Sequence, residues 1–406
     1  MTRGVRLQYS FEADPPQGAK QDNAGQHGGA VHNPLFDLLS AVHEQGSIQH
    51  AAMSIGASYR HVWGALKHWQ TVLGQPLVTW SQGQPARLTP FAERLLWAET
   101  RARARLTPHI EALRAELEHV LAAALDGSQQ VLTIYASHDL ALPRLRERAS
   151  ASHGLHIDLR FAGSLDALRA LAAGRCTVAG FHVPAGVQEG SLFARQLKPL
   201  LKPGRHKLIG CSRRRQGLMV APGNPLQLQS LADVAGLGAR FVGRQAGSGT
   251  RLLLEHLLWQ QGLAADALDA VSAVAEDSHL AVAAAVASGA ADAGLGIEAA
   301  ALRFGLDFVP LADEQYHLVC LRDALDEPPV RKLREVLHSA DWAALVAALP
   351  GYAAADSGEV LSLTRALPWW RFRRGKAQAG AARRTAGAPV SVEADVRLAD
   401  GHRRPV

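Results

Sequence analysis

The chain has 406 residues, of which 48% are hydrophobic and 20% charged, and a formal net charge of +6. At roughly 150 residues per domain, this length predicts two or three globular domains, and the composition excludes a fibrous or mainly disordered protein. The N-terminal segment has no apolar run that could form a signal-peptide core, and the longest Ala/Val/Leu stretches are broken by polar residues. We therefore expect neither export nor a membrane span.

Cysteine and histidine usage argues against a metal protein. The three cysteines, Cys176, Cys211 and Cys320, are isolated and odd in number, which fits a reducing compartment better than a disulfide framework. The 18 histidines form no spaced motif such as His-Glu-x-x-His. We expect a cytoplasmic protein with no metal ion and no cofactor.

The positive charge is concentrated at the C-terminal end. From Arg365 onward, ten basic residues face three acidic ones, so this tail carries +7 and the rest of the chain is near −1. Overall basicity therefore does not indicate nucleic-acid binding by itself, and that inference must rest on motifs.

The first part of the chain is predicted to be helical. Residues 1–30 are rich in Gly, Gln, Asp and Pro and are expected to form a disordered arm. Three short helices fit between Pro34 and Leu73, and apolar pieces on both sides of the Gly/Pro turn at 81–85 predict a hairpin, which completes a domain at 31–90. Residues 91–127 then form one long helix, with Pro108 as a candidate kink. A helix of that length outside a large core usually packs on a partner, so we expect a homodimer or a higher homo-oligomer.

A second architecture begins near residue 128. Strand and helix patterns alternate from Val131 onward at the spacing of a parallel sheet, which predicts an α/β domain over 128–355. About 200 residues are enough for two lobes. The run from Lys198 to Arg215 is interpreted as a solvated loop or a connection between lobes. Residues 375–406 return to low complexity and are expected to form a disordered basic tail.

The sharpest local motif lies between Gly46 and Lys67. Ser47 can cap a short helix, Gly56 permits a tight turn, and Ser58 can cap a second helix. Polar residues at the start of that second helix suit a recognition helix in the DNA major groove. Any small helical bundle has capped helices and glycine turns, but the hairpin and the long helix that follow favour DNA binding.

In sequence this region resembles the winged helix-turn-helix of molybdate-responsive (ModE-type) repressors and of LysR-type regulators. The resemblance covers about 33–96 and rests on Gly46–Ile48, Ala51–Ala52, Gly56–Ser58, Val62–Trp63, Leu73–Leu77 and Leu88–Thr89. It implies an all-α winged domain, a dimerising helix and double-stranded DNA as a partner. The residues that it places near DNA are Ser47, Ser58, Tyr59, Arg60 and Lys67, and Arg87 in the hairpin can act as a wing on the phosphate backbone.

A glycine-rich turn at Phe241–Arg251 is followed by an apolar helical pattern. Free N–H groups at a helix start, together with the helix dipole, favour an anion. An ordinary strand-to-helix turn with Ser/Thr capping would give the same pattern, and the Gly-Lys-Ser/Thr of a Walker motif is absent. The segment looks like the Ser-Gly-Thr turn of periplasmic phosphate- and tungstate-binding proteins, and 131–318 resembles a two-lobed periplasmic-binding-protein-like (PBP-like) sensor domain.

The resemblance implies a small anionic effector, with molybdate or tungstate first. Formate or another small organic acid, or sulfate or phosphate, is the alternative, because molybdate repressors themselves sense with small β-barrels. In a two-lobed fold the ligand lies between lobes at strand ends. The candidate ligand-binding residues are Ser137, Ser164, Arg244, Ser248, Gly249, Thr250, Arg251, Ser278 and Tyr316, with His138 and His279 as weaker candidates.

We expect no enzymatic activity. The neighbours Ser137, His138 and Asp139 are triad residue types, but adjacent residues do not normally converge on one reaction centre, and no Gly-x-Ser-x-Gly elbow is present. The sequence thus predicts a transcriptional regulator that senses an anion. A cytoplasmic anion-binding protein without regulatory DNA binding is the second interpretation.

Overall fold

The computed structural model describes residues 33–80, 85–125, 130–272 and 275–370. The expected N-terminal arm and the basic tail at 375–406 lie outside the described residues. No helix in the described ranges is both long enough and apolar enough to cross a bilayer.

The N-terminal domain is three helices and a short hairpin. The helices are α1 (Pro34–Gln45), α2 (Ile48–Ser54) and α3 (Tyr59–Leu73), and strands β1 (Val78–Thr79) and β2 (Arg87–Leu88) pair antiparallel. Ser47 and Ser58 accept hydrogen bonds from the third backbone N–H beyond them, and Gly56 has a φ of +66°, as expected of two capped helices joined by a tight turn. Apolar side chains from all these elements form one core.

A single long helix, α4 (Pro90–Leu125), leaves this domain. Thr89 caps it by accepting a hydrogen bond from the N–H of Ala92 at 3.2 Å. Its 36 residues span about 54 Å at 1.5 Å per residue. Pro108 lies inside the helix, and the helix packs against α10 and β4 of the following domain.

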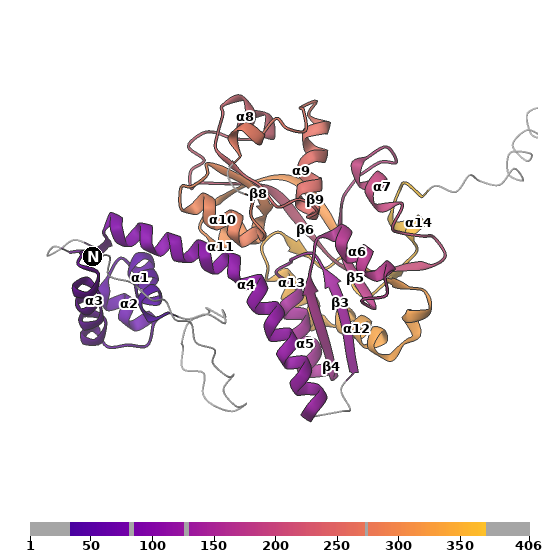
Figure 1. Ribbon diagram of the computed structural model, residues 1–406, viewed down its shortest axis with the longest axis horizontal. Helices are drawn as coiled ribbons and strands as arrows, with labels where there is room; N and C mark the ends of the chain where they lie inside the picture. Colours follow the sequence, from indigo (N-terminus) through magenta and orange to yellow (C-terminus); the bar gives the residue numbers. More distant parts are fainter. Residues whose placement is uncertain (1–32, 81–84, 126–129, 273–274, 371–406) are drawn as a thin grey trace, which may run out of the picture. The chain divides into compact units, whose positions relative to one another are not determined.

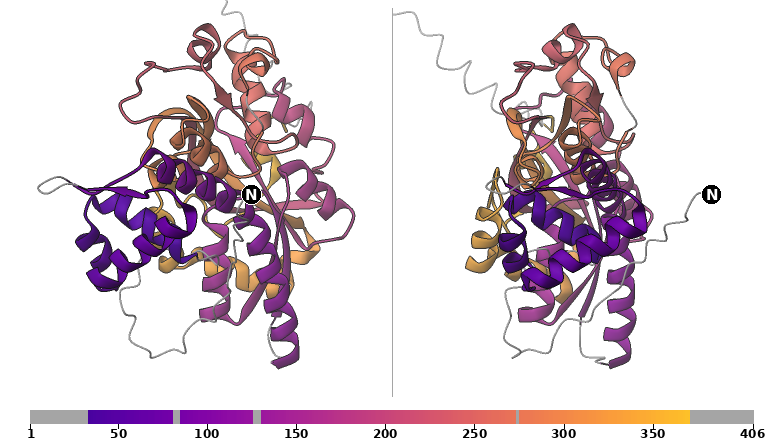
Figure 2. Two further views of the ribbon diagram at one scale, coloured as in Figure 1. Left: turned by 60° about the vertical axis from the view of Figure 1, so that its left-hand side comes forward. Right: turned by 90° about the vertical axis from the view of Figure 1, so that its left-hand side faces the viewer.

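The remaining chain forms a two-lobed α/β domain around one mixed sheet, with strand order β4-β3-β5-β9-β6-β8-β7 (Figure 1). The first lobe contains β3 (Gln130–Ala136), α5 (Leu142–His153), β4 (Leu155–Phe161), α6 (Ser164–Ala172), β5 (Val178–Pro184) and α12 (Pro328–His338). The second contains α8 (Leu231–Gly236), β7 (Phe241–Val242), α9 (Gly249–Gln260), α10 (His279–Ala287), β8 (Ala293–Ile297) and α11 (Glu298–Arg303). Helices cover both faces of the sheet (Figure 2).

Two long strands join the lobes. They are β6 (His206–Val220) and β9 (Asp307–Leu321), which pair antiparallel along their length. The C-terminal half of β9 pairs with β5 of the first lobe, and the C-terminal end of β6, at the other end of this strand pair, pairs with β8 of the second lobe. The parallel prediction is thus confirmed for β3, β4 and β5, while these crossing strands make the complete sheet mixed.

Two expectations need correction. The run from Lys198 to Arg215 is a connection between lobes but not a solvated loop, because β6 carries Arg213–Arg215 with the middle arginine fully buried. The packed body also continues beyond 355, since β11 (Val360–Leu361) pairs with β6 and Trp369 is buried. The other elements are α7 (Leu192–Leu197), η1 (Asp269–Val271), η2 (Asp323–Asp326), α13 (Ala340–Ala347), β10 (Tyr352–Ala353) and α14 (Leu363–Ala366).

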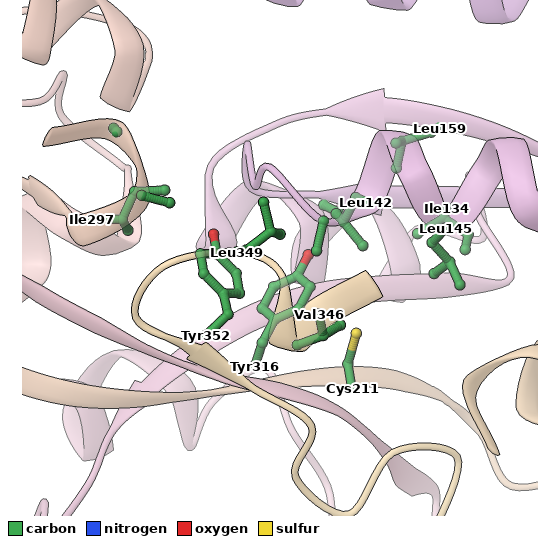
Figure 3. Close-up of a cluster of buried hydrophobic side chains, with 14 of the residues drawn as sticks. Ile134, Leu142, Leu145, Leu159, Cys211, Ile297, Tyr316, Val346, Leu349 and Tyr352 are labelled. Carbon is green, nitrogen blue, oxygen red and sulfur yellow. The ribbon is translucent and has the colours of Figure 1, made fainter. Parts of the chain in front are cut away.

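The core of the first lobe extends under the junction of the lobes. Ile134, Leu142, Leu145 and Leu159 belong to the same buried cluster as Tyr316 and Tyr352 (Figure 3). The two tyrosines therefore connect apolar packing with the polar residues between the lobes.

Candidate functional site

The predicted DNA-contacting residues lie on α3, on the helix caps Ser47 and Ser58, and on β2. Tyr59, Arg60 and Lys67 are exposed on α3, and Arg87 is exposed on β2. In the described part of the chain, none of the three basic side chains forms an ion pair, and Lys67 lies over the Trp63 ring at 5.4 Å. These cations are therefore available to phosphate groups.

Ser47 and Ser58 have a different role from the basic residues. Their hydroxyl oxygens accept from the N–H groups of His50 and His61, at 3.4 and 3.2 Å. Both serines fix the starts of α2 and α3, and so they set the position of the helix that carries Tyr59, Arg60 and Lys67.

Between the lobes, two helix starts meet. Ser164 begins α6 of the first lobe, and Gly249 begins α9 of the second. A Cβ built on Gly249 would lie 2.9 Å from the Ser164 Oγ, and one on Gly163 would collide with the carbonyl of Gly247. The positive ends of two helix dipoles thus converge at the contact between the lobes.

Several donors at this contact have no acceptor within the described structure. The buried Ser164 hydroxyl has no hydrogen-bond partner, and the N–H groups of Gly249 and Thr250 precede the first hydrogen-bonded turn of α9. Thr250 Oγ1 accepts a hydrogen bond from Gln216 Nε2 at 3.2 Å, which leaves its own proton to donate. This donor set suits an oxyanion.

Ser248 caps α9 beside the site, whereas Ser278 lies against α4, and the hydroxyls of both are already committed. Ser248 Oγ accepts from the Arg251 N–H and donates to the Gln245 carbonyl. Ser278 Oγ caps α10 and donates to the Ala104 carbonyl of α4 at 3.1 Å. Neither residue therefore offers a free hydroxyl proton.

The two candidate arginines point in different directions. Arg244 is only 6% exposed and donates to the carbonyls of Glu276 and Asp277, at 3.2 and 2.6 Å. Burial, with the positive charge of Arg214 nearby, lowers the pKa of Arg244 to about 10, so it remains charged at pH 7. Arg251 instead pairs with Glu255 at 2.9 Å on the outer face of α9. Arg244 is therefore the buried arginine of the two, and Arg251 is the surface one.

A buried polar network lies between the junction of the lobes and the crossing strands β6 and β9. Arg214 of β6 donates to Asp139 at 2.7 Å and to Glu314 at 3.2 Å, and Gln216 donates to Glu314 at 2.7 Å. Tyr352 also donates to Asp139, at 2.8 Å. The two carboxylates thus both bind Arg214, whereas Arg244 binds the backbone carbonyls of Glu276 and Asp277.

Ser137 lies beside a histidine that the sequence did not single out. Its Oγ is 2.8 Å from His182 Nδ1, and His182 Nε2 is 3.8 Å from Asp139, too far for a hydrogen bond. Tyr316 stacks on His182 with ring centroids 4.2 Å apart and fills the space above Gly180. Asp139 already bonds Arg214, Tyr352 and the Ala141 N–H, so its carboxylate is not committed to His182 as in a hydrolytic triad.

The buried histidines His138, His279 and His317 are neutral at pH 7. Burial, with Arg244 nearby, lowers the pKa of His138 to about 3, and burial beside His182 lowers the pKa of His317 to about 4. Burial, with Arg244 and Arg214, also lowers the pKa of His279. Among the described residues no group of three or more His, Cys, Asp or Glu could hold a metal ion.

Helix α4 touches the segment that holds Arg244. Arg105 donates to both carboxylate oxygens of Glu276, at 2.7 and 2.6 Å, and burial leaves Glu276 only 3% exposed. The backbone carbonyl of the same Glu276 accepts from Arg244. Glu276 therefore contacts both the linker helix α4, through Arg105, and the buried Arg244.

The sequence singled out Ser137, Ser164, Arg244, Gly249 and Thr250, which the structure brings to the junction of the lobes. It missed His182, Arg214, Gln216, Glu276 and Glu314. The run Arg213–Gln216 is polar throughout, so its pattern contains no signal that Arg214 and Gln216 are the two buried side chains of this strand segment.

Comparison with known proteins agrees with this division of the chain. Residues 35–93 match the family described as bacterial regulatory helix-turn-helix protein, lysR family, and residues 145–338 match the PBP superfamily domain. The chain joins a LysR-family helix-turn-helix to a PBP-superfamily domain.

Two curated relatives are uncharacterized proteins. YvgK of Bacillus subtilis is 33% identical over 202 residues, which cover 50% of this chain and 64% of YvgK. An uncharacterized protein in the ferredoxin 2Fe-2S gene 5' region of Clostridium pasteurianum is 34% identical over 86 residues, 21% of this chain and 76% of that protein. This chain is therefore in one family with the clostridial protein, and it spans less than two thirds of the length of YvgK.

Solved LysR-type structures are more distant. A cysteine-to-serine mutant of OxyR from Corynebacterium glutamicum, with hydrogen peroxide bound, is 17% identical, with a TM-score of 0.39 and coverage of 78% of this chain and 94% of that one. CbnR, a LysR family transcriptional regulator, is 17% identical, with a TM-score of 0.36 and coverage of 75% and 98%.

Proposed function

We propose that this LysR-type protein is a DNA-binding transcriptional regulator whose PBP-like domain binds a small oxyanion of the molybdate or tungstate type. The observation that carries the proposal is the meeting of two helix starts, at Ser164 and Gly249, with unpaired N–H and O–H donors around them. Neutral donors and helix dipoles are well suited to an anion that must be released again.

The anion would bridge the lobes. Ser164 and the N–H groups of Gly249 and Thr250 donate from opposite sides, so bound anion favours the closed arrangement over an open one. A ligand shifts such an equilibrium only by its difference in affinity for the two states. Arg244 adds one buried positive charge, which partly offsets the two carboxylates that bind Arg214.

The second copy of the chain would pack along α4. Leu106, Leu113 and Leu117 are 41%, 58% and 64% exposed and, with Ile110, recur at spacings of four, three and four residues. This is the spacing of a coiled-coil seam. A symmetric dimer presents two recognition helices to two half-sites of DNA, as a helix-turn-helix regulator requires.

DNA binding is tested by selecting sequences from random duplexes with the purified protein and measuring the affinity for the selected duplex. We expect Arg60→Ala with Lys67→Ala to weaken this binding at least tenfold and to lower its salt dependence, because two phosphate contacts are lost. Arg195→Ala, in α7 of the sensor domain, is the matched control and should leave the affinity unchanged. Failure of the wild-type protein to select any sequence, or unchanged binding by the double variant, would contradict the proposal.

A further inference from the structure

We propose that Gln216 is a positioning residue that makes the Thr250 hydroxyl a donor to the bound anion; this inference rests on the proposed anion site. Gln216 lies on β6, is completely buried, and touches both Thr250 and Glu314 through the same nitrogen. Thr250 is the second residue of α9 and offers the anion a backbone N–H as well.

The direction of these hydrogen bonds follows from Glu314. Its carboxylate accepts from Arg214 at 3.2 Å and from Gln216 at 2.7 Å, and an ionised carboxylate can only accept. The amide nitrogen of Gln216 must therefore face Glu314, which settles the orientation of the amide group. Because this nitrogen also lies 3.2 Å from Thr250 Oγ1, the threonine oxygen accepts.

A threonine hydroxyl has one proton and two lone pairs. When Gln216 donates to one lone pair, the proton is left for another acceptor, and the anion supplies one. A residue at 216 that accepted a hydrogen bond would draw the Thr250 proton away and turn a lone pair toward the anion. The side chain at 216 therefore determines whether Thr250 attracts or repels the ligand.

Exchange of two side chains tests this role. Gln216→Glu combined with Glu314→Gln keeps the composition and net charge of the network but places an acceptor next to Thr250. We expect tungstate affinity, measured by calorimetry, to fall at least tenfold in the wild-type background and less than twofold in a Thr250→Val background. An equal loss in both backgrounds, or no loss in the wild type, would overturn the positioning role.

If the exchanged protein does not fold, a second set of variants tests the same coupling between positions 216 and 250. Gln216→Met removes the donor without adding a charge, and we expect a threefold to tenfold loss of affinity that disappears in the Thr250→Val background; a loss that persists there overturns the inference. Wild-type protein that binds none of the tested anions would contradict the proposed function itself, whereas binding without coupling between 216 and 250 contradicts only this inference.

Pro108 interrupts the backbone hydrogen bonds of α4. Pro108 has no N–H, so the Ala104 carbonyl one turn earlier lacks its helical donor. The Ser278 hydroxyl takes that place by donating to the Ala104 carbonyl at 3.1 Å, and Arg105 binds Glu276 beside it. The second lobe therefore holds α4 just before the proline.

The first lobe holds α4 just after the proline. Arg146 of α5 donates to the side chain of Glu111 at 3.1 Å and to its carbonyl at 3.4 Å. The helix lacks a hydrogen bond between these two attachments, and a proline is where a helix bends most readily. We infer that Pro108 is a hinge through which relative movement of the lobes changes the direction of α4.

Pro108→Ala tests the hinge, because alanine restores the N–H that would bond Ala104 and stiffen the helix. We expect tungstate affinity within threefold of the wild type, but a ratio of DNA affinities with and without tungstate that moves at least fivefold toward one. Ala102→Ser, on the same helix, is the control and should keep the ratio. A full wild-type response in Pro108→Ala would overturn the hinge, and a wild-type protein without any tungstate response would contradict the proposed function.

Discussion

A single methyl group at Gly249 should block the proposed anion site. A Cβ at this position would lie 2.9 Å from Ser164 Oγ and 3.9 Å from His182 Nδ1, in the space between the two lobes. The backbone of Gly249 does not adopt a positive φ, so alanine fits the chain, and the Ser164 hydroxyl can rotate away. We therefore expect Gly249→Ala to fold with a free energy of unfolding within about 1 kcal/mol of the wild type.

Anion binding should respond much more strongly than folding. The methyl group displaces the anion from the Ser164 hydroxyl and the Gly249 N–H, and each hydrogen bond to a charged group contributes about 1.5–3 kcal/mol. The loss of both predicts an affinity for tungstate that is at least ~100-fold weaker by calorimetry. Gly243→Ala is the matched control, since its Cβ would make ordinary contacts at 3.5 and 4.0 Å. Wild-type affinity in Gly249→Ala would refute this location of the site.

Three further predictions concern charge, protonation and assembly. Arg244→Gln should weaken tungstate binding about tenfold or more in calorimetry, whereas Arg251→Gln, which removes only a surface pair with Glu255, should change it less than twofold; equal effects would contradict the assignment. Because burial lowers the pKa of His317 to about 4, the unfolded chain binds the proton first, so stability is lost as the pH falls from about 6.5 to 4, by up to ~1.4 kcal/mol per pH unit. Denaturant titrations at several pH values should show a shallower slope in His317→Gln, and an identical slope would be inconsistent with this proton uptake. Leu113→Asp should convert a dimer to monomers in sedimentation equilibrium while Leu302→Asp does not, and a monomeric wild type would contradict the seam.

Local sequence signals were sufficient for the fold of the helix-turn-helix region. Ser47 and Ser58 cap the expected helices, Gly56 makes the turn, and the spacing of Val62 and Leu66 buries one face of α3. Each of these features depends on residues within one or two helical turns, which is the range over which a sequence pattern carries physical information.

The residues at the junction of the lobes were only partly predictable. The glycine-rich turn identified Gly249 and Thr250, because a helix start is visible in the sequence. Arg214 was interpreted as part of a loop, since an arginine is rarely buried without a partner. Its partners Asp139 and Glu314 are 75 and 100 residues away in the chain, and only the crossing strands bring them together.

The proposed oxyanion site is tested most directly by thermal and chemical unfolding of the purified full chain in tungstate, molybdate, sulfate, phosphate and formate. An anion present at about 100 times its dissociation constant should stabilise the protein by ~2.7 kcal/mol. We expect a selective stabilisation by tungstate or molybdate that is absent in Gly249→Ala and kept in Gly243→Ala. Stabilisation by none of the five anions, or an equal shift in Gly249→Ala, would contradict an oxyanion site between the lobes.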